Sequence, residues 1–320
     1  MSASRIDVHA HSLPPCFKEA VVAAGRGPTI TSGFPSWSPE QALELMDRHD
    51  IQTSILSVSQ PGVHFGDDAQ ARELARACNE FHAEVVARWP RRFGAFVTVP
   101  LPNVDDACTE IDYALSTLGA DGVCLLASYG ERFLGDAYFD PVMDVLNDRE
   151  AVVFIHPNFH PSSRNLTLGW PGWMAEFLFD TTRAAMNLVF SGALQRFPRI
   201  KFILAHAGGT LPYIAWRQSM APFIDPRFAD LTPEEILRRI GTFYFDTAIS
   251  AGAATLGALT EIAPQDHILF GSDWPYAPAE VTARTVDALT TSPRLDAPAQ
   301  AAIARNNALA LFPRLRDHHA

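Results

Sequence analysis

The chain has little of what marks secreted, membrane-embedded and nucleic-acid-binding proteins. It holds four cysteines in 320 residues, none in a C-x-x-C pair, which favours free thiols over a disulfide framework. It has no run of about 18 apolar residues, and it does not open on a basic and then apolar signal segment. Its 25 basic and 36 acidic side chains give a formal charge of −11, which argues against nucleic-acid or anionic-membrane partners. We therefore expect a cytoplasmic protein.

Strand-like and helix-like runs alternate along the whole chain. Strands are expected at 5–9, 53–59, 93–99, 122–126, 151–156, 202–205, 243–246 and 267–270. Helices are expected at 38–50, 67–89, 104–118, 139–148, 176–190, 279–290 and 298–312, and a loop rich in proline and glycine at 12–37. Many of the strands are apolar on both faces, as a buried parallel sheet requires.

Eight strands alternating with helices predict an α/β fold, a (β/α)8 TIM barrel. We expect a single domain over residues 1–320, with an inserted loop region near the barrel mouth at 157–172. A doubly wound open sheet is the alternative. The dinucleotide-binding version of that sheet has little support, because no G-x-G-x-x-G follows the first strand.

Two histidines, His9 and His11, stand where the first predicted strand ends. Residues two apart on a strand point to the same face, so the two imidazoles converge and make half of a metal site. Other strand ends supply a complement: His156, His206 and Asp273. In a barrel these ends meet at one mouth.

Three imidazoles and a carboxylate suit one divalent transition metal with an open position, Zn²⁺ first and Mn²⁺ as the alternative. The remaining histidine, which we take to be His206, is then free for acid–base catalysis. Each residue alone also has a structural interpretation. A strand-end histidine can be a hydrogen-bonded core residue, and Asp273 can cap the turn that follows it.

Four motifs resemble the amidohydrolase superfamily, in the branch of the aminocarboxymuconate-semialdehyde decarboxylases. They are His156-Pro157, Ala205-His206-Ala207-Gly208-Gly209, Phe270-Gly271-Ser272-Asp273-Trp274-Pro275 and Asn307-Ala308-Leu309-Ala310-Leu311-Phe312. Within it, Ile6 to Pro15, Ser57 to Gly62 and Phe179 to Ala184 are most similar to 6-methylsalicylate decarboxylase-like proteins and to uracil-5-carboxylate decarboxylases. The resemblance covers essentially the whole chain.

The resemblance implies metal ligation by His9, His11, His156 and Asp273, with His206 beside the substrate as acid or base. It also implies a substrate-carboxylate contact from Arg217, on the helix after the H-x-G-G turn, sometimes across a dimer interface. A surface ion pair is the alternative for that arginine. We expect Arg183 as a second anion contact.

Two absences refine the resemblance. Binuclear members of the superfamily use a carboxylated lysine after strand four, but the chain has only Lys18 and Lys201, and neither lies there. A single metal is therefore expected. The aminocarboxymuconate enzymes also carry an arginine that the stretch 29–35 lacks. That difference favours an aromatic acid as substrate.

These features predict a metal-dependent, non-oxidative decarboxylase of a small, salicylate-like aromatic acid. His206 or Asp273 would supply the proton. Trp274 and the loop Leu168 to Trp173 would wall a flat ring, or else pack in the core. Hydrolysis of a lactone or amide at the same site is the alternative reaction, and a structural metal protein is a third interpretation. Family precedent suggests a homodimer or homotetramer.

Overall fold

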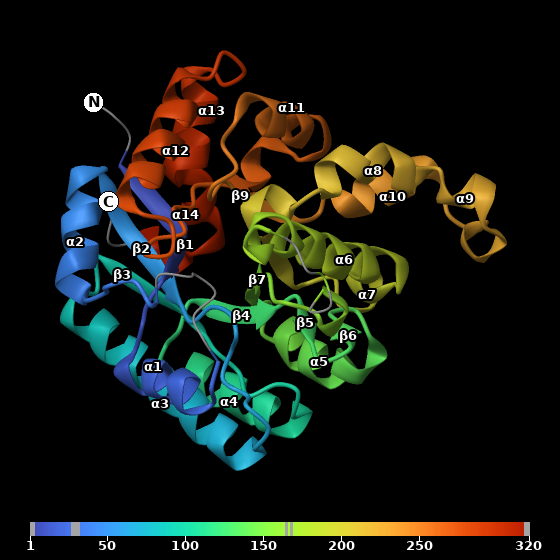
Figure 1. Cartoon of the computed structure of the whole chain (residues 1–320). Coiled ribbons are helices and arrows are strands. Elements are labelled where there is room, and N and C mark those ends of the chain that lie inside the picture. The colour runs from blue at the N-terminus through green and yellow to red at the C-terminus, as the bar shows by residue number, and fades with distance from the viewer. Residues whose placement is uncertain (1–3, 27–32, 164–165, 167–168, 317–320) are drawn as a thin grey trace.

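Eight parallel strands form the centre of the molecule. The computed structural model describes residues 4–26, 33–163, 166 and 169–316 (Figure 1). The central strands are β1 (Arg5–His11), β2 (Ile51–Ser57), β3 (Phe93–Val97), β4 (Gly122–Leu126), β7 (Val152–His156), β8 (Lys201–Leu204), β9 (Tyr244–Asp246) and β10 (Ile268–Leu269). A short hairpin of β5 (Ser128–Tyr129) and β6 (Arg132–Phe133) follows β4.

The strands pair in their order along the chain, and every neighbouring pair is parallel. The first and last strands also meet. The Val8 amide donates to the Phe270 carbonyl (3.0 Å), and the His11 amide donates to the Trp274 carbonyl (2.8 Å). The sheet is therefore a nearly closed barrel, and the (β/α)8 prediction is confirmed. The open-sheet alternative is wrong, because a doubly wound sheet reverses its strand order at a switch point.

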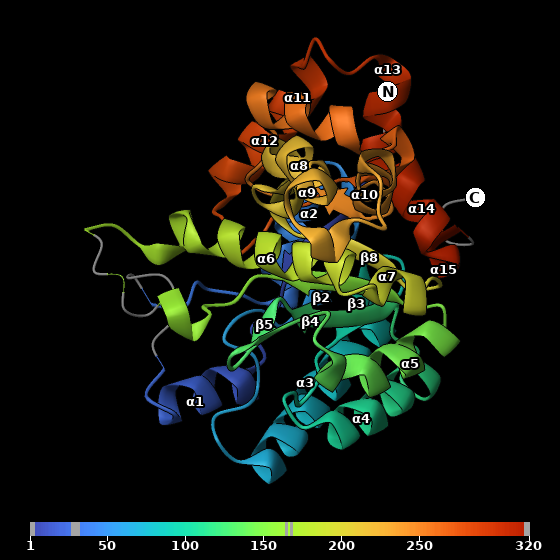
Figure 2. The same cartoon turned by 90° about the vertical axis from the view of Figure 1, so that its right-hand side faces the viewer.

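Helices surround the strands on the outside in both views of the chain (Figures 1 and 2). They are α1 (Pro15–Ala23), α2 (Pro39–Arg48), α3 (Asp68–Arg88), α4 (Val104–Ser116), α5 (Asp140–Asp148), α6 (Glu176–Phe190), α7 (Ala193–Arg196), α8 (Leu211–Ser219), α9 (Ala221–Ile224), α10 (Pro233–Ile240), α11 (Ala253–Ile262), α12 (Ala279–Thr291), α13 (Ala297–Ala301), α14 (Asn307–Leu311) and α15 (Pro313–Arg316). No helix in the described part of the chain is long and apolar enough to cross a membrane.

Most predicted elements lie within a few residues of the observed ones. Ser38 caps α2 as expected, because its side chain accepts from the Gln41 amide and Pro39 takes the first helical position. The predicted loop at 12–37 is wrong over α1. There Pro15 starts a helix that buries Phe17 and Val21 against the core. Residues 27–32 of that predicted loop lie outside the described residues.

A buried carboxylate lies under the seam between β1 and the turn after β10. Asp7 accepts from the Ser272 hydroxyl (2.6 Å), the Ser272 amide (3.0 Å) and the His9 amide (3.1 Å). Burial raises the pKa of Asp7 to about 7. A buried carboxyl group is stable only when its hydrogen bonds are made. The Asp7–Ser272 contact therefore ties the two ends of the barrel together.

Replacing Ser272 by alanine should destabilise the protein by about 1–3 kcal/mol, because Asp7 stays buried and loses its hydroxyl donor. Urea unfolding followed by circular dichroism measures the change. The control is Ser36→Ala, whose hydroxyl contacts Gln41 at the surface and should matter by less than about 0.5 kcal/mol. Equal stability of the two variants would contradict this role of the seam.

Candidate metal centre and active site

Four side chains from the two ends and the middle of the chain converge at the mouth of the barrel. His9 and His11 come from β1, His156 ends β7, and Asp273 follows β10. One potential ligand atom from each lies within 4.8 Å of the others, and all four residues are buried. The Asp273 Oδ1 atom is 3.0 Å from the His11 Nε2 and 3.4 Å from the His9 Nε2. The structure thus brings together the four residues that the sequence singled out as metal ligands.

The outer nitrogen of each histidine has an oxygen partner. The Nδ1 atom of His9 lies 2.7 Å from an Asp246 carboxylate oxygen, and that of His156 lies 2.8 Å from the Pro157 carbonyl. These oxygens only accept, so each Nδ1 carries the proton. The His11 Nδ1 lies 2.9 Å from the Ser57 hydroxyl, which donates to the Ala10 carbonyl and is therefore also an acceptor there.

This arrangement directs three Nε2 lone pairs and one carboxylate oxygen at a common point. The His9 and His11 Nε2 atoms are only 3.1 Å apart, a separation that a shared cation would stabilise. Burial alone would lower the pKa of His9, but the carboxylates of Asp246 and Asp273 outweigh it and raise the pKa to about 10. Burial lowers the pKa of His156 well below its usual range. The donor set therefore fits one divalent cation.

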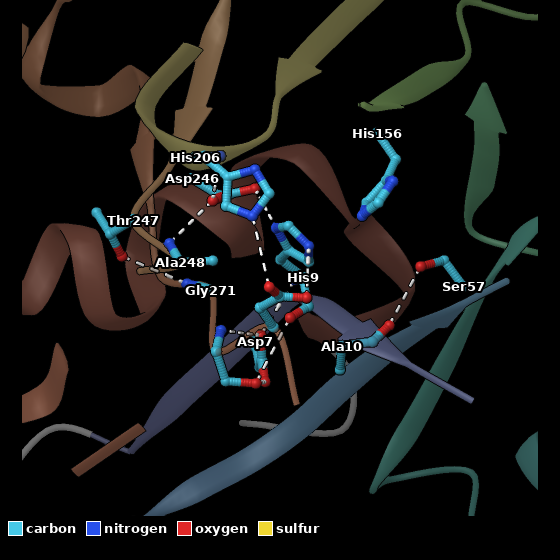
Figure 3. A network of polar contacts seen from close by, with 12 residues as sticks. Asp7, His9, Ala10, Ser57, His156, His206, Asp246, Thr247, Ala248 and Gly271 are labelled. Atoms are coloured by element: carbon cyan, nitrogen blue, oxygen red, sulfur yellow. Dashed lines mark hydrogen bonds and ion pairs between the residues drawn. The ribbon is translucent and has the colours of Figure 1, made fainter. Parts of the chain in front are cut away.

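Asp246 is the residue that sequence reasoning missed. It ends β9, is fully buried, and accepts from the His9 ring, the His206 amide (3.0 Å) and the Ala248 amide (2.9 Å) (Figure 3). Its signal in the sequence was its position, since it is the last residue of a predicted barrel strand. Asp246 fixes the orientation of His9 and the path of the backbone at His206.

Close backbone packing completes the site. Asp273 donates its amide to the His9 carbonyl at 2.7 Å and adopts a positive φ of 61°. A Cβ atom at Gly271 would lie 2.8 Å from the His9 Cβ, so a side chain there would displace His9. Such strained or crowded backbone is often retained where function needs a fixed geometry.

His206 stands beside the cluster and at the edge of a cavity. Its Nε2 is 3.5 Å from the Asp273 Oδ2, and its buried Nδ1 has no hydrogen-bond partner among the described residues. Burial would raise the pKa of Asp273, but the neighbouring imidazoles, His9 foremost, hold it well below its usual range. Asp273 is therefore a carboxylate beside a histidine with one unpaired ring nitrogen, which is an arrangement suited to proton transfer.

The cavity next to the cluster has a volume of about 460 Å³ and is lined by both polar and apolar residues. Its polar lining includes His156, His206, Asp273, Ser59 and Tyr276. The apolar wall comes from the start of α6 with the turn before it and from the start of α12. Its described residues are Trp173, Met174, Phe177, Leu178, Ala277, Pro278 and Val281.

The structure separates the predicted substrate contacts. Trp173 lines this cavity, Trp170 lines a neighbouring cavity of about 640 Å³, and Leu168 lies outside the described residues. Trp274 is half-buried, and its backbone pairs with β1, where its carbonyl accepts from the His11 amide. Arg183 and Arg217 are exposed, on α6 and α8, and neither is among the described residues that line the cavity.

A family model described as amidohydrolase matches residues 6–314. The chain belongs to the amidohydrolase family. It is 42% identical to the 6-methylsalicylic acid decarboxylase of Penicillium expansum, over 98% of this chain and 97% of that protein. A solved amidohydrolase II shares 30% identity with it at a TM-score of 0.89, covering 96% of this chain and 99% of that one. A dihydroxybenzoic acid decarboxylase from Polaromonas sp. was solved with bound manganese and the inhibitor 2-nitroresorcinol, and it is 26% identical at a TM-score of 0.81, covering 97% of both chains.

The sequence resemblance to this family and to its 6-methylsalicylate branch is therefore confirmed.

Replacing Asp246 by asparagine should weaken the binding of Mn²⁺ or Zn²⁺ about 10–100-fold, because the amide no longer fixes the His9 tautomer. Titration calorimetry on the metal-free protein measures the affinity. The matched control is Asp266→Asn, which changes an exposed carboxylate just before β10 and should bind the metal ion as the wild type does. Unchanged affinity in the Asp246 variant would show that His9 needs no such partner.

Proposed function

We propose that this protein is a metal-dependent, non-oxidative decarboxylase of a small aromatic carboxylic acid with a hydroxyl next to the carboxylate. One observation carries the proposal: a buried cluster of three histidines and one aspartate borders a cavity that is lined largely by apolar side chains. The named decarboxylase relative at 42% identity supports it. Salicylate with an apolar ring substituent, such as 6-methylsalicylate, is the first substrate class to test.

The cation that we propose at the cluster is single and divalent, held by His9, His11, His156 and Asp273. The three nitrogens and one carboxylate oxygen suit Zn²⁺, and Mn²⁺, the ion named for the Polaromonas relative, is the alternative. When bound, such an ion supplies positive charge that binds and polarises anionic oxygens.

The free cysteines and the lack of a membrane-spanning helix in the described residues support our assignment to the cytoplasm.

The residues around the cavity have separate tasks in this reaction. The apolar wall at Phe177 and Val281 packs against the substrate ring, fixes its orientation and keeps water away from it. Tyr276 lines the cavity, with its ring 5.3 Å from that of His11, and burial raises the pKa of its hydroxyl to about 12. It therefore stays protonated and donates a hydrogen bond to a substrate oxygen.

The proton that replaces the carboxyl group comes from the pair of His206 and Asp273. It is added to the ring carbon that bears the carboxylate, which interrupts the aromatic system. The carbon–carbon bond then breaks, carbon dioxide leaves, and the ring recovers its aromaticity. We assign His206 as the residue that holds this proton and Asp273 as the residue next to it on the transfer path. The His206 Nε2 and the Asp273 Oδ2 are 3.5 Å apart, and both residues line the cavity.

Replacing Asp273 by asparagine should lower kcat at least about 10³-fold, because the proton path is broken, while substrate still binds. Carbon dioxide release from 6-methylsalicylate, salicylate and 2,6-dihydroxybenzoate measures turnover by the metal-loaded protein, and fluorescence titration measures binding. Asp287→Asn, an exposed carboxylate on α12, is the control. Full carbon dioxide release by the Asp273 variant would contradict this proton path. Ring opening of lactones with uptake of ¹⁸O from water would overturn decarboxylation in favour of hydrolysis.

We also propose that the protein assembles as a homodimer or homotetramer. Four large apolar side chains on α8 and α9, which we call the α8–α9 patch, are 71–86% exposed: Tyr213, Trp216, Phe223 and Ile224. These helices project from the barrel wall (Figure 1). Large exposed apolar side chains on consecutive helices are typical of a protein interface. Arg217 lies on the same helix, so assembly is the route by which it would approach a cavity of another copy.

The double variant Tyr213→Ser, Trp216→Ser should run as a 35.1 kDa monomer, whereas the wild type runs as a dimer or tetramer, because the variant loses both apolar side chains that α8 contributes to the patch. Light scattering after size-exclusion chromatography gives the masses. Val22→Ser on α1, at a residue that is 66% exposed, is the control and should keep the wild-type mass. A monomeric wild-type protein would contradict the assembly.

A further inference from the structure

Two cysteines lie in contact away from the active-site cavity. The Sγ atoms of Cys16 and Cys78 are 3.9 Å apart. Cys16 is the second residue of α1 and is partly exposed, whereas Cys78 lies in α3 and is fully buried. Neither is among the described residues that line the cavity next to the metal cluster. The pair is thus a chemical feature that the proposed reaction does not use.

We propose that Cys16 and Cys78 form an oxidation site, at which a peroxide converts the two thiols into a reversible intramolecular disulfide. Cys16 is the thiol that meets the oxidant, because it is the partly exposed member. Cys78 is the resolving thiol, because it is already in contact with the Cys16 sulfur. This inference does not rest on the proposed decarboxylase function.

The geometry needs only a small movement to close the bond. A disulfide has an S–S distance of about 2.05 Å, so the two sulfurs must approach by about 2 Å. The segment that leads into α1 also contacts α3 one helical turn further along, where the His82 ring is hydrogen-bonded to the Ser12 hydroxyl. Both residues of that second contact are buried. The segment between β1 and α1 is therefore held against α3 beside the cysteine pair, which keeps the sulfurs together.

The environment of Cys16 favours its reactive form. The hydrogen bond with Cys78 outweighs partial burial and lowers the pKa of Cys16 to about 7. A thiolate is the nucleophile in thiol oxidation, so a large fraction of Cys16 is reactive near neutral pH. The pKa of Cys78 is raised well above its usual range by the same hydrogen bond and by burial, which keeps its proton in place until the second step.

The chemistry balances in two steps. The Cys16 thiolate attacks one oxygen of hydrogen peroxide, the O–O bond breaks, and a sulfenic acid forms while hydroxide leaves and is protonated to water. The Cys78 sulfur then attacks the Cys16 sulfur, the S–O bond breaks, and the second oxygen leaves as water with the Cys78 proton. Two thiols are oxidised to one disulfide, and one peroxide is reduced to two waters. A dithiol reductant reverses the reaction.

The other two cysteines provide an internal control. Cys124 is buried, and burial raises the pKa of its thiol to about 12. Cys108 donates to the Pro141 carbonyl at 3.6 Å, and burial raises its pKa as well. Both thiols are therefore protonated at neutral pH, and we expect peroxide to react with neither of them before Cys16.

The test treats the folded, full-length protein with a small excess of hydrogen peroxide at neutral pH. Intact mass should fall by two hydrogens, two of the four thiols should disappear, and dithiothreitol should restore both. Trypsin should then release the peptides Ile6–Lys18 and Ala77–Arg88 as one linked species. Cys108→Ser is the matched control and should form the same bridge at the same rate.

Two variants separate the roles of the sulfurs. Cys16→Ser should lose no thiol pair under the same treatment. Cys78→Ala, which keeps an apolar group at the buried position, should stop at the Cys16 sulfenic acid and be labelled there by dimedone. Melting curves confirm that both variants are folded. Oxidation that starts at Cys108 or Cys124, or wild-type protein that carries the dimedone label without forming the linked peptides, would overturn the proposal.

Discussion

The candidate site depends on the seam where the barrel closes. His9 and His11 come from the first strand, and Asp273 comes from the turn after the last one. Asp7 is buried beneath this seam, and its carboxylate accepts hydrogen bonds from the amide and the hydroxyl of Ser272. The Asp273 amide is bonded to the His9 carbonyl at 2.7 Å, so two of the proposed ligands are joined directly by backbone. The cluster consequently exists only when the two ends of the barrel are together.

The buried carboxylates at the seam favour the binding of a cation there. The Asp246 and Asp273 carboxylates both lie against His9 in surroundings that water scarcely reaches. Buried carboxylates are costly unless a positive charge balances them. That charge can be a proton on His9, whose pKa the two carboxylates raise to about 10, or a cation in its place. The hydrogen bonds at each outer nitrogen hold the rings with their inner nitrogens facing the same point, which favours the cation.

Sequence alone predicts the parts of this site that follow a local rule. The spacing of His9 and His11 places both on one strand, and the strand ends at His156, His206 and Asp273 must share one mouth once a barrel is assumed. The contacts of Asp7 and Asp246 join residues 265 and 237 positions apart, and no periodicity encodes such pairs. Helix α1 was missed because proline and glycine dominate its surroundings, while Phe17 and Val21 find their core only in three dimensions. The expected anion contacts at Arg183 and Arg217 rested on resemblance, and the fold leaves both at the surface of one chain.

The shape of the cavity bears on which reaction the cluster performs. Decarboxylation removes a charged group and leaves a neutral gas, so its transition state benefits from surroundings that solvate charge less well than water does. Phe177, Leu178 and Val281 supply such surroundings within the same cavity as His206 and Asp273. Hydrolysis instead consumes a water molecule, which an apolar wall excludes. The neighbouring cavity is larger, at about 640 Å³, but its described lining contains none of the four clustered residues. Chemistry therefore assigns the smaller cavity to catalysis, and the apolar wall within it favours loss of carbon dioxide over attack by water.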